Sequence, residues 1–144
     1  MLRKSLLFSE KTHLNATLLF IRLCAGFLMV YLHGWSKLMA GTNRWERLGS
    51  SLAEAIGLDF MSIPLGFMAS FAESIAAIFL IFGFPTRPAA FLLSCTMLVA
   101  SIKKLELGLK AAELPLLFLL LSFIILLNGA GKYSLDHRIF RTKK

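Results

Sequence analysis

Ionisable side chains inside long apolar segments are the residues of this sequence that could do chemistry. Glu73 stands within the apolar stretch 67–88, and Arg22 stands within the first apolar run, about 15–38. A carboxylate at the centre of a bilayer costs about 2.5–3.5 kcal/mol on insertion scales, so Glu73 should face protein or water and have a partner. In antiparallel membrane helices, a rise of 1.5 Å per residue places Arg22 about 10 Å and Glu73 about 13 Å from the same end. We therefore predict that Arg22 and Glu73 form an ion pair.

A second polar layer is predicted nearer the other end of these helices. His33 and Lys37 are four residues apart and lie on the same helix face as Arg22. Lys103 and Lys104 end the third apolar run, and Glu113 begins the fourth. In a four-helix bundle these groups could lie together at one end, around the opening of a single pocket. The candidate intramembrane site is therefore Arg22, His33, Lys37, Glu73 and Glu113.

The predicted pair of Arg22 and Glu73 has two possible interpretations. Either the buried pair only pins two helices together, or it forms the floor of a pocket for a polar headgroup or a proton. His13 and His137 lie away from His33, so we predict no metal site and no haem. Cys24 and Cys95 are far apart and form no Cys-x-x-Cys motif. We expect both to be small, buried hydrophobic residues that perform no thiol–disulfide exchange by themselves.

The composition places these residues in a membrane. The 144 residues include 57% hydrophobic residues, and the mean hydropathy is +0.72. This is too apolar for a soluble domain of this size, so lipid must cover part of the surface. The net charge of +8 comes from basic residues in the termini and between apolar runs. That distribution is typical of membrane proteins, and we do not expect binding to nucleic acid.

Four apolar runs define the elements that position the polar residues. We predict spans at about 15–38, 60–82, 87–102 and 111–127, of which the third is the shortest. Between the first two, Trp45, Leu48, Leu52 and Ile56 recur at helical spacing and indicate a short helix in the interface. The predicted fold is all-α: one domain, residues 1–144, forming an integral membrane bundle of four transmembrane helices with a short interfacial helix between helices 1 and 2. Small residues of the second span should allow close helix packing: Gly66, Ala69, Ser70, Ala76 and Ala77.

The charges between the spans predict the orientation. Four spans put both termini on one side, where Arg3, Lys4, Arg87 and Lys132 meet few acids. The opposite side carries both signs of charge. The positive-inside rule therefore places both termini in the cytoplasm.

Three sequence blocks, together with Arg22, carry a family resemblance. They are HGWSKL at 33–38, AESIAAIFLIFGFPTRPAA at 72–90 and NGAGKYSLD at 128–136. Over residues 18–136 the chain resembles the DoxX family, and the pattern ESxxxxxLxxGFxTRxAA is the most specific part. The resemblance implies a small four-helix protein of the bacterial inner membrane. It also implies the family's polar signature at Arg22, His33, Lys37, Glu73, Arg87, Glu113, Lys132 and Asp136, of which Arg87, Lys132 and Asp136 would form a structural motif.

The resemblance also implies a function. The family name comes from the small subunit of a thiosulfate:quinone oxidoreductase, and other relatives are linked to thiol and oxidative-stress complexes. We expect a membrane subunit of a redox complex, with a quinone-like headgroup held between Arg22, His33 and Glu73, and no catalysis by this chain alone. The expected partners are the lipid bilayer, a protein of that complex and, in one arrangement, a second copy of the chain. The alternatives are a carrier for a small acid or proton, and a membrane scaffold with no ligand site.

Overall fold

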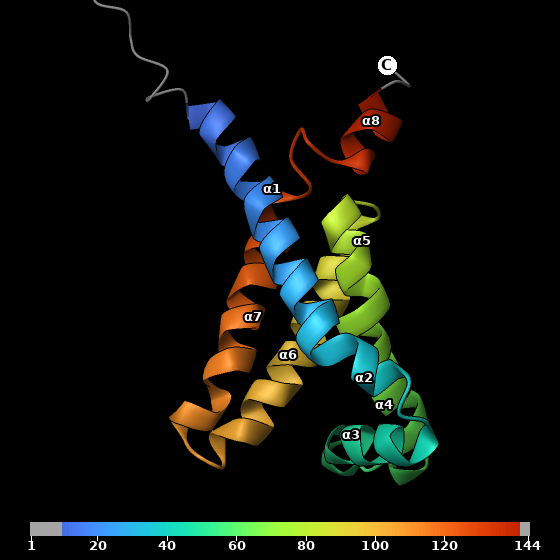
Figure 1. Ribbon diagram of the computed structural model, residues 1–144. Helices are drawn as coiled ribbons and strands as arrows, with labels where there is room; N and C mark the ends of the chain where they lie inside the picture. The colour runs from blue at the N-terminus through green and yellow to red at the C-terminus, as the bar shows by residue number, and fades with distance from the viewer. Residues whose placement is uncertain (1–9, 142–144) are drawn as a thin grey trace, which may run out of the picture.

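The computed structural model describes residues 10–141, and within them the chain is a bundle of helices (Figure 1). Four stretches are long and apolar enough to cross a membrane: His13–Leu38, Asp59–Phe82, Thr86–Leu105 and Leu109–Asn128. The predicted four-helix membrane bundle is therefore confirmed. The third span, predicted as the shortest, has 20 residues, as does the fourth, because its helix continues through Lys103 and Lys104 to Leu105.

The first two spans are each interrupted by one π-helical turn. The first span consists of α1 (Glu10–Met29), the π turn η2 (Val30–Gly34) and α2 (Trp35–Leu38). The second consists of the short 3₁₀ turn η3 (Asp59–Met61), α4 (Ser62–Phe71), the π turn η4 (Ala72–Ala76) and α5 (Ala77–Phe82). The third and fourth spans are the continuous helices α6 (Thr86–Leu105) and α7 (Leu109–Asn128). A π turn adds one residue to a helical turn and is frequent at functional sites.

The expected helix between the first two spans is present as α3 (Thr42–Ala55). Two glycines allow α3 to approach α4 closely. A Cβ atom on Gly49 would lie 1.9 Å from the carbonyl oxygen of Ser62, and one on Gly66 would lie 1.7 Å from that of Trp45. The Trp45 ring packs edge-on against Phe67 with centroids 5.0 Å apart. This helix is thus fixed on α4.

The core between the spans combines small, polar and apolar side chains. Ser94 of α6 donates its hydroxyl to Ser122 of α7 at 2.9 Å, and both are buried. The buried face of α6 includes four residues that recur at helical spacing: Ala90, Ser94, Met97 and Ser101. Large apolar side chains such as Phe20 and Phe91 are more than half exposed. On a membrane-spanning bundle these side chains face lipid.

Both described ends of the chain lie at the same end of the bundle. Figure 1 shows the start of α1 at the same end of the bundle as α8 (Leu135–Arg141), with α3 at the opposite end. We call these the terminal end and the α3 end. The arrangement agrees with termini on one side of the membrane. Several of the basic residues used for the charge count, among them Arg3 and Lys4, lie outside the described residues.

Candidate functional site

The buried carboxylate of the second span has a partner, but it is not the predicted one. Glu73 is 3% exposed and forms an ion pair with Lys37, the only ion pair among the described residues. The amine of Lys37 donates a hydrogen bond to Oε2 of Glu73. Side chains of a helix lean toward its N-terminus. Lys37 stands near the end of the first span, so its side chain reaches back into the membrane.

The two π turns face each other at this pair. Gly34 closes η2, and Glu73 belongs to η4. A Cβ atom on Gly34 would lie 2.1 Å from the backbone oxygen of Glu73, so only glycine allows this approach. The indole of Trp45 donates to the backbone oxygen of Lys37 at 3.0 Å. The helix backbones therefore hold both members of the ion pair in place.

His33 completes this cluster. It is half-buried on η2, and the charges of Lys37, Glu73 and Lys104 all act on its imidazole. The ring also packs edge-on against Phe118 of α7, with centroids 6.1 Å apart. His33 thus stands between the charged pair and the fourth span.

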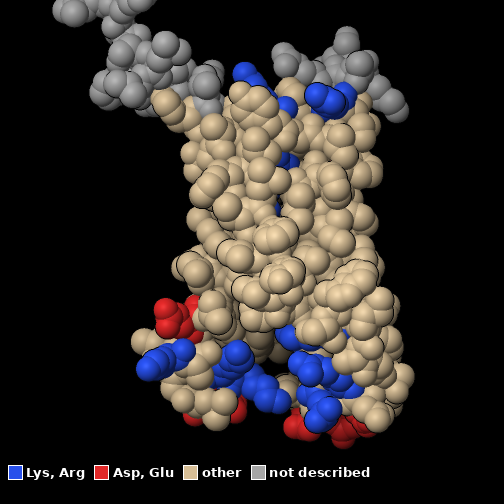
Figure 2. Space-filling model, viewed as in Figure 1, with Lys and Arg blue, Asp and Glu red and all other residues tan. Residues whose placement is uncertain are grey.

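The side chain of Lys37 is 21% exposed, and the surface of the bundle is hollowed at the α3 end. Figure 2 shows a hollow there, between the α6–α7 hairpin and the part of the molecule formed by α2, α3 and α4. Lys and Arg side chains gather around the hollow, and Asp and Glu lie toward its outer edge (Figure 2). We call it the basic hollow. The amine of Lys103 at the end of α6 donates to the hydroxyl of Ser51 on α3, which ties its two sides together.

The predicted ion pair between Arg22 and Glu73 is wrong. Arg22 is fully buried, but its Nη2 donates to the backbone oxygen of Tyr133 at 2.7 Å, and its Nη1 would clash with a Cβ on Gly83. Arg22 is thus level with the end of α5. Gly34, which is level with Glu73, lies about 18 Å further along the helix at 1.5 Å per residue. Residue counts from the ends of the apolar runs do not give the relative depths of Arg22 and Glu73, because α1 continues beyond the end of α5 toward the terminal end (Figure 1).

Arg22 belongs instead to a second polar cluster, formed with the segment that follows α7. The charge of Asp136 attracts the guanidinium of Arg22. Asp136 accepts a hydrogen bond from the backbone N–H of Thr86 at 2.9 Å, and its own N–H donates to the oxygen of Gly83 at 3.0 Å. The backbone N–H of Lys132 donates to the Asn15 side chain at 2.8 Å. The C-terminal segment is therefore fastened over the terminal end of the bundle.

Two further predictions are corrected. Glu113 is exposed on α7 and makes no ion pair with any described residue, so the structure does not bring it into the Glu73 cluster. Cys24 and Cys95 are free, as expected, but both are exposed on the lipid-facing surface instead of buried. A thiol is as stable in contact with lipid as in a protein core. The hydrophobicity of the surrounding sequence therefore does not distinguish a buried cysteine from one that faces lipid.

The arrangement defines a class of protein: a multi-pass helical membrane protein with a buried carboxylate–lysine pair between two π turns. The comparison with known families identifies its relatives. Residues 17–103, which include Arg22, His33, Lys37, Glu73 and Arg87, match the DoxX family, and the chain belongs to that family. Neither the comparison with curated proteins nor that with solved structures gave a match.

Proposed function

We propose that the chain is the membrane subunit of a redox complex and that it binds a quinone with its headgroup at His33, Lys37 and Glu73. One observation carries the proposal. Phe118 packs against the His33 ring and also lines an apolar groove between α1 and α7, of about 200 Å³. A site for a polar headgroup and a site for an apolar tail are thus contiguous, as a membrane quinone requires.

The groove fits an isoprenoid tail by its chemistry. Its lining is entirely apolar or weakly polar: Phe20, Ile21, Cys24, Ala25, Leu28, Leu117, Phe118 and Leu121. It runs along the lipid-facing junction of α1 and α7, so a tail could enter it from the bilayer. Ligand sites in proteins commonly combine such apolar walls with a few polar groups that fix orientation.

The charged cluster fits the headgroup. A quinone carries two carbonyl oxygens, which accept hydrogen bonds, and both the imidazole of His33 and the amine of Lys37 can donate them. Glu73 holds Lys37 in position and balances its charge. Reduction of a quinone to a quinol takes up two electrons and two protons. In this proposal a partner protein supplies the electrons, while His33 and Glu73 transfer protons that enter through the basic hollow.

Quantifying quinone that copurifies with the protein tests the proposal. The protein is extracted in a mild detergent, and quinone per protein is measured by mass spectrometry in the parent, His33→Ala, Glu73→Gln and Glu113→Gln. We expect the parent and Glu113→Gln to retain quinone, because Glu113 lies outside the cluster, and the other two variants to lose most of it. Equal retention in all four proteins, or none in the parent, contradicts the proposal and favours a scaffold role.

A further inference from the structure

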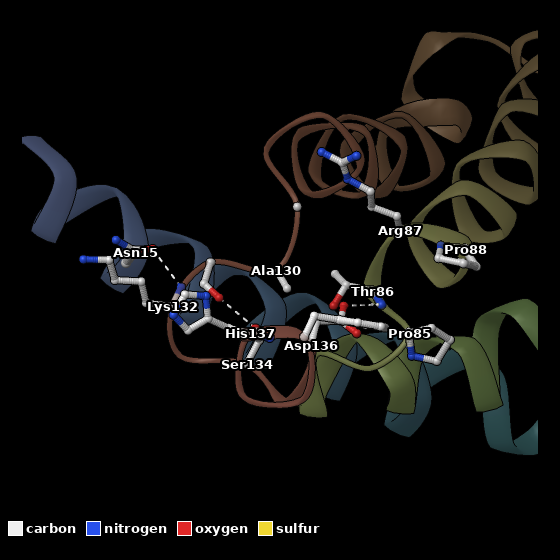
Figure 3. Close-up of a pocket in the computed structure, with 13 residues that line it drawn as sticks. Asn15, Pro85, Thr86, Arg87, Pro88, Ala130, Lys132, Ser134, Asp136 and His137 are labelled. Atoms are coloured by element: carbon white, nitrogen blue, oxygen red, sulfur yellow. Dashed lines mark hydrogen bonds between the residues drawn. The ribbon is translucent and has the colours of Figure 1, made fainter. Parts of the chain in front are cut away.

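A pocket at the terminal end is not used by the proposed quinone site. Its volume is about 650 Å³, and it lies between the start of α6 and the segment that follows α7. We call it the terminal pocket. Its walls are formed by the residues that Figure 3 draws: Asn15, Pro85, Thr86, Arg87, Pro88, Gly129, Ala130, Gly131, Lys132, Ser134, Asp136, His137 and Phe140.

The terminal pocket carries an excess of positive charge. Arg87 and Lys132 both line it, and both side chains are exposed. Neither forms an ion pair with any side chain in the described part of the protein. Figure 3 shows Arg87 and Lys132 on different sides of the pocket, with Asp136 between them. These two cations are thus available to an anion from outside the chain.

The carboxylate in the wall does not cancel this charge. Asp136 directs one oxygen to the backbone N–H of Thr86 at 2.9 Å, and it forms no ion pair with the buried guanidinium of Arg22 or with any other described residue. Arg22 is 0% exposed and lies outside the pocket lining. Asp136 thus sets one negative charge against the two positive charges of Arg87 and Lys132, and the lining keeps an excess of positive charge for a ligand. The buried hydroxyl of Thr86, which has no hydrogen-bond partner among the described residues, adds a donor in the same wall.

The surroundings of the pocket indicate which anion it takes. The pocket stands where the third span begins and the fourth ends, which is the level of the lipid headgroups. Phe140 of α8 lines it and is 66% exposed, and the neighbouring Ile139 is 43% exposed. Cationic and apolar groups therefore stand side by side at the membrane surface. Basic pockets between transmembrane helices commonly bind anionic lipid headgroups.

We propose that the terminal pocket binds a phosphate group through Arg87 and Lys132, and that the headgroup of an anionic phospholipid supplies it. A free phosphate ion carries the same chemistry, so the experiment separates the two sources. The inference does not depend on the quinone proposal, because the His33 cluster lies toward the α3 end of the bundle.

A lipid titration of the full-length protein in detergent tests the proposal. Phosphatidylglycerol or phosphatidylcholine is added, and bound lipid is counted by native mass spectrometry. The variants are Arg87→Gln, Lys132→Gln and the double variant, with Lys110→Gln as the control that removes an exposed lysine at the α3 end. Each cation near a membrane surface should contribute about fivefold in affinity for an anionic lipid.

We expect the parent and Lys110→Gln to prefer phosphatidylglycerol, each single variant to lose about fivefold and the double variant about 25-fold. Equal affinity of the parent for the two lipids, or an unchanged preference in the double variant, overturns the proposal. Thermal unfolding in detergent shows whether each variant is folded. If the double variant is not, the parent's preference between the two lipids and its weakening with added salt decide the question.

Inorganic phosphate identifies the source of the anion. We expect it to displace phosphatidylglycerol only at concentrations far above that of the lipid, because the apolar side chain of Phe140 in the pocket wall favours a lipid and not a free ion. Displacement at equal concentration shows that the site takes free phosphate, and it overturns the assignment to a lipid.

Discussion

Gly34 lies directly against the backbone of Glu73, at a place where a Cβ atom would come within 2.1 Å of the Glu73 carbonyl oxygen. The two π turns thus meet backbone to backbone, and this contact sets the depth of Glu73 against the first span. Small residues permit such approaches in membrane helices, where van der Waals packing has to replace the hydrophobic effect.

Gly34→Ala should therefore be among the most damaging single-methyl changes in this protein. The new methyl group meets backbone atoms, which cannot move independently, so we expect a loss of about 3 kcal/mol, at the upper end of the range for overpacking. Gly26→Ala is the matched comparison. Its nearest neighbour is the Ile81 side chain at 2.6 Å, which can shift. Its nearest backbone atom is the oxygen of Ala77 at 2.9 Å, further away than the 2.1 Å at Gly34, so the loss should be smaller. Thermal unfolding in detergent measures both, and an equal or larger effect of Gly26→Ala contradicts the prediction.

The orientation in the membrane is open to a direct test. In a background with Cys24→Ala and Cys95→Ala, a single cysteine is placed at exposed positions of the two ends, as Leu135→Cys on α8 or Asn43→Cys on α3. The positive-inside rule predicts that Leu135→Cys is cytoplasmic. An impermeant maleimide added to whole cells should label Asn43→Cys only, and both after lysis. Labelling of Leu135→Cys in intact cells reverses the proposed orientation.

The two native cysteines provide an internal control for the quinone site. Cys24 lines the groove between α1 and α7, whereas Cys95 is exposed on α6 outside it. A membrane-permeant maleimide should label both. At a concentration about ten times Kd, a quinone with a long alkyl chain should slow labelling of Cys24 roughly tenfold, because only the empty fraction reacts. Labelling of Cys95 should not change, and equal protection of both cysteines speaks against a quinone in the groove.

The sequence predicts the elements of the bundle well, because they follow from local patterns. Length and hydropathy locate the four spans, and the face of the first span that carries Arg22, Gly26 and His33 is the one turned toward its neighbours. The second span ends where its predicted bounds, 60–82, place the end: Gly83 follows it with φ of +71°, and its N–H donates to the oxygen of Phe79. Each of these features depends on residues close together in the chain.

The pairing of the charges could not be predicted in the same way, because it depends on relative depth. Counting residues from the ends of the two apolar runs places Arg22 opposite Glu73 if the two runs end at the same depth. They do not: the second span ends level with Arg22, and α1 continues beyond it. Beyond Gly83, toward the terminal end, the neighbour of Arg22 is the segment that follows α7, more than a hundred residues away in the sequence. The backbone oxygen of Tyr133 in that segment accepts the hydrogen bond from Arg22. The spacing of Gly34 and Lys37 in HGWSKL was a usable signal: a glycine for close contact and, one turn later, a lysine that leans back toward it.

The corrected pairing makes an asymmetric prediction for the ion pair. Lys37→Met leaves the carboxylate of Glu73, whose side chain is 4% exposed, buried without its partner. Loss of one member of a buried pair typically costs about 3–5 kcal/mol. Glu73→Leu should cost less than this, because the side chain of Lys37 is 21% exposed and can turn toward water at the α3 end.

Double variants separate this pairing from the one that the sequence suggested. Lys37→Met with Glu73→Leu should recover much of the stability lost in Lys37→Met, since an apolar pair can replace a buried ion pair. Arg22→Leu with Glu73→Leu should show the sum of its single effects, because the two side chains share no partner.

Thermal unfolding in detergent gives both double-mutant cycles, and quinone content measured on the same samples adds the functional result. A Lys37–Glu73 double variant that is stable but has lost its quinone indicates a ligand site, whereas recovery of both indicates a pair that only joins helices. Coupling between Arg22 and Glu73, with none between Lys37 and Glu73, contradicts the architecture described above.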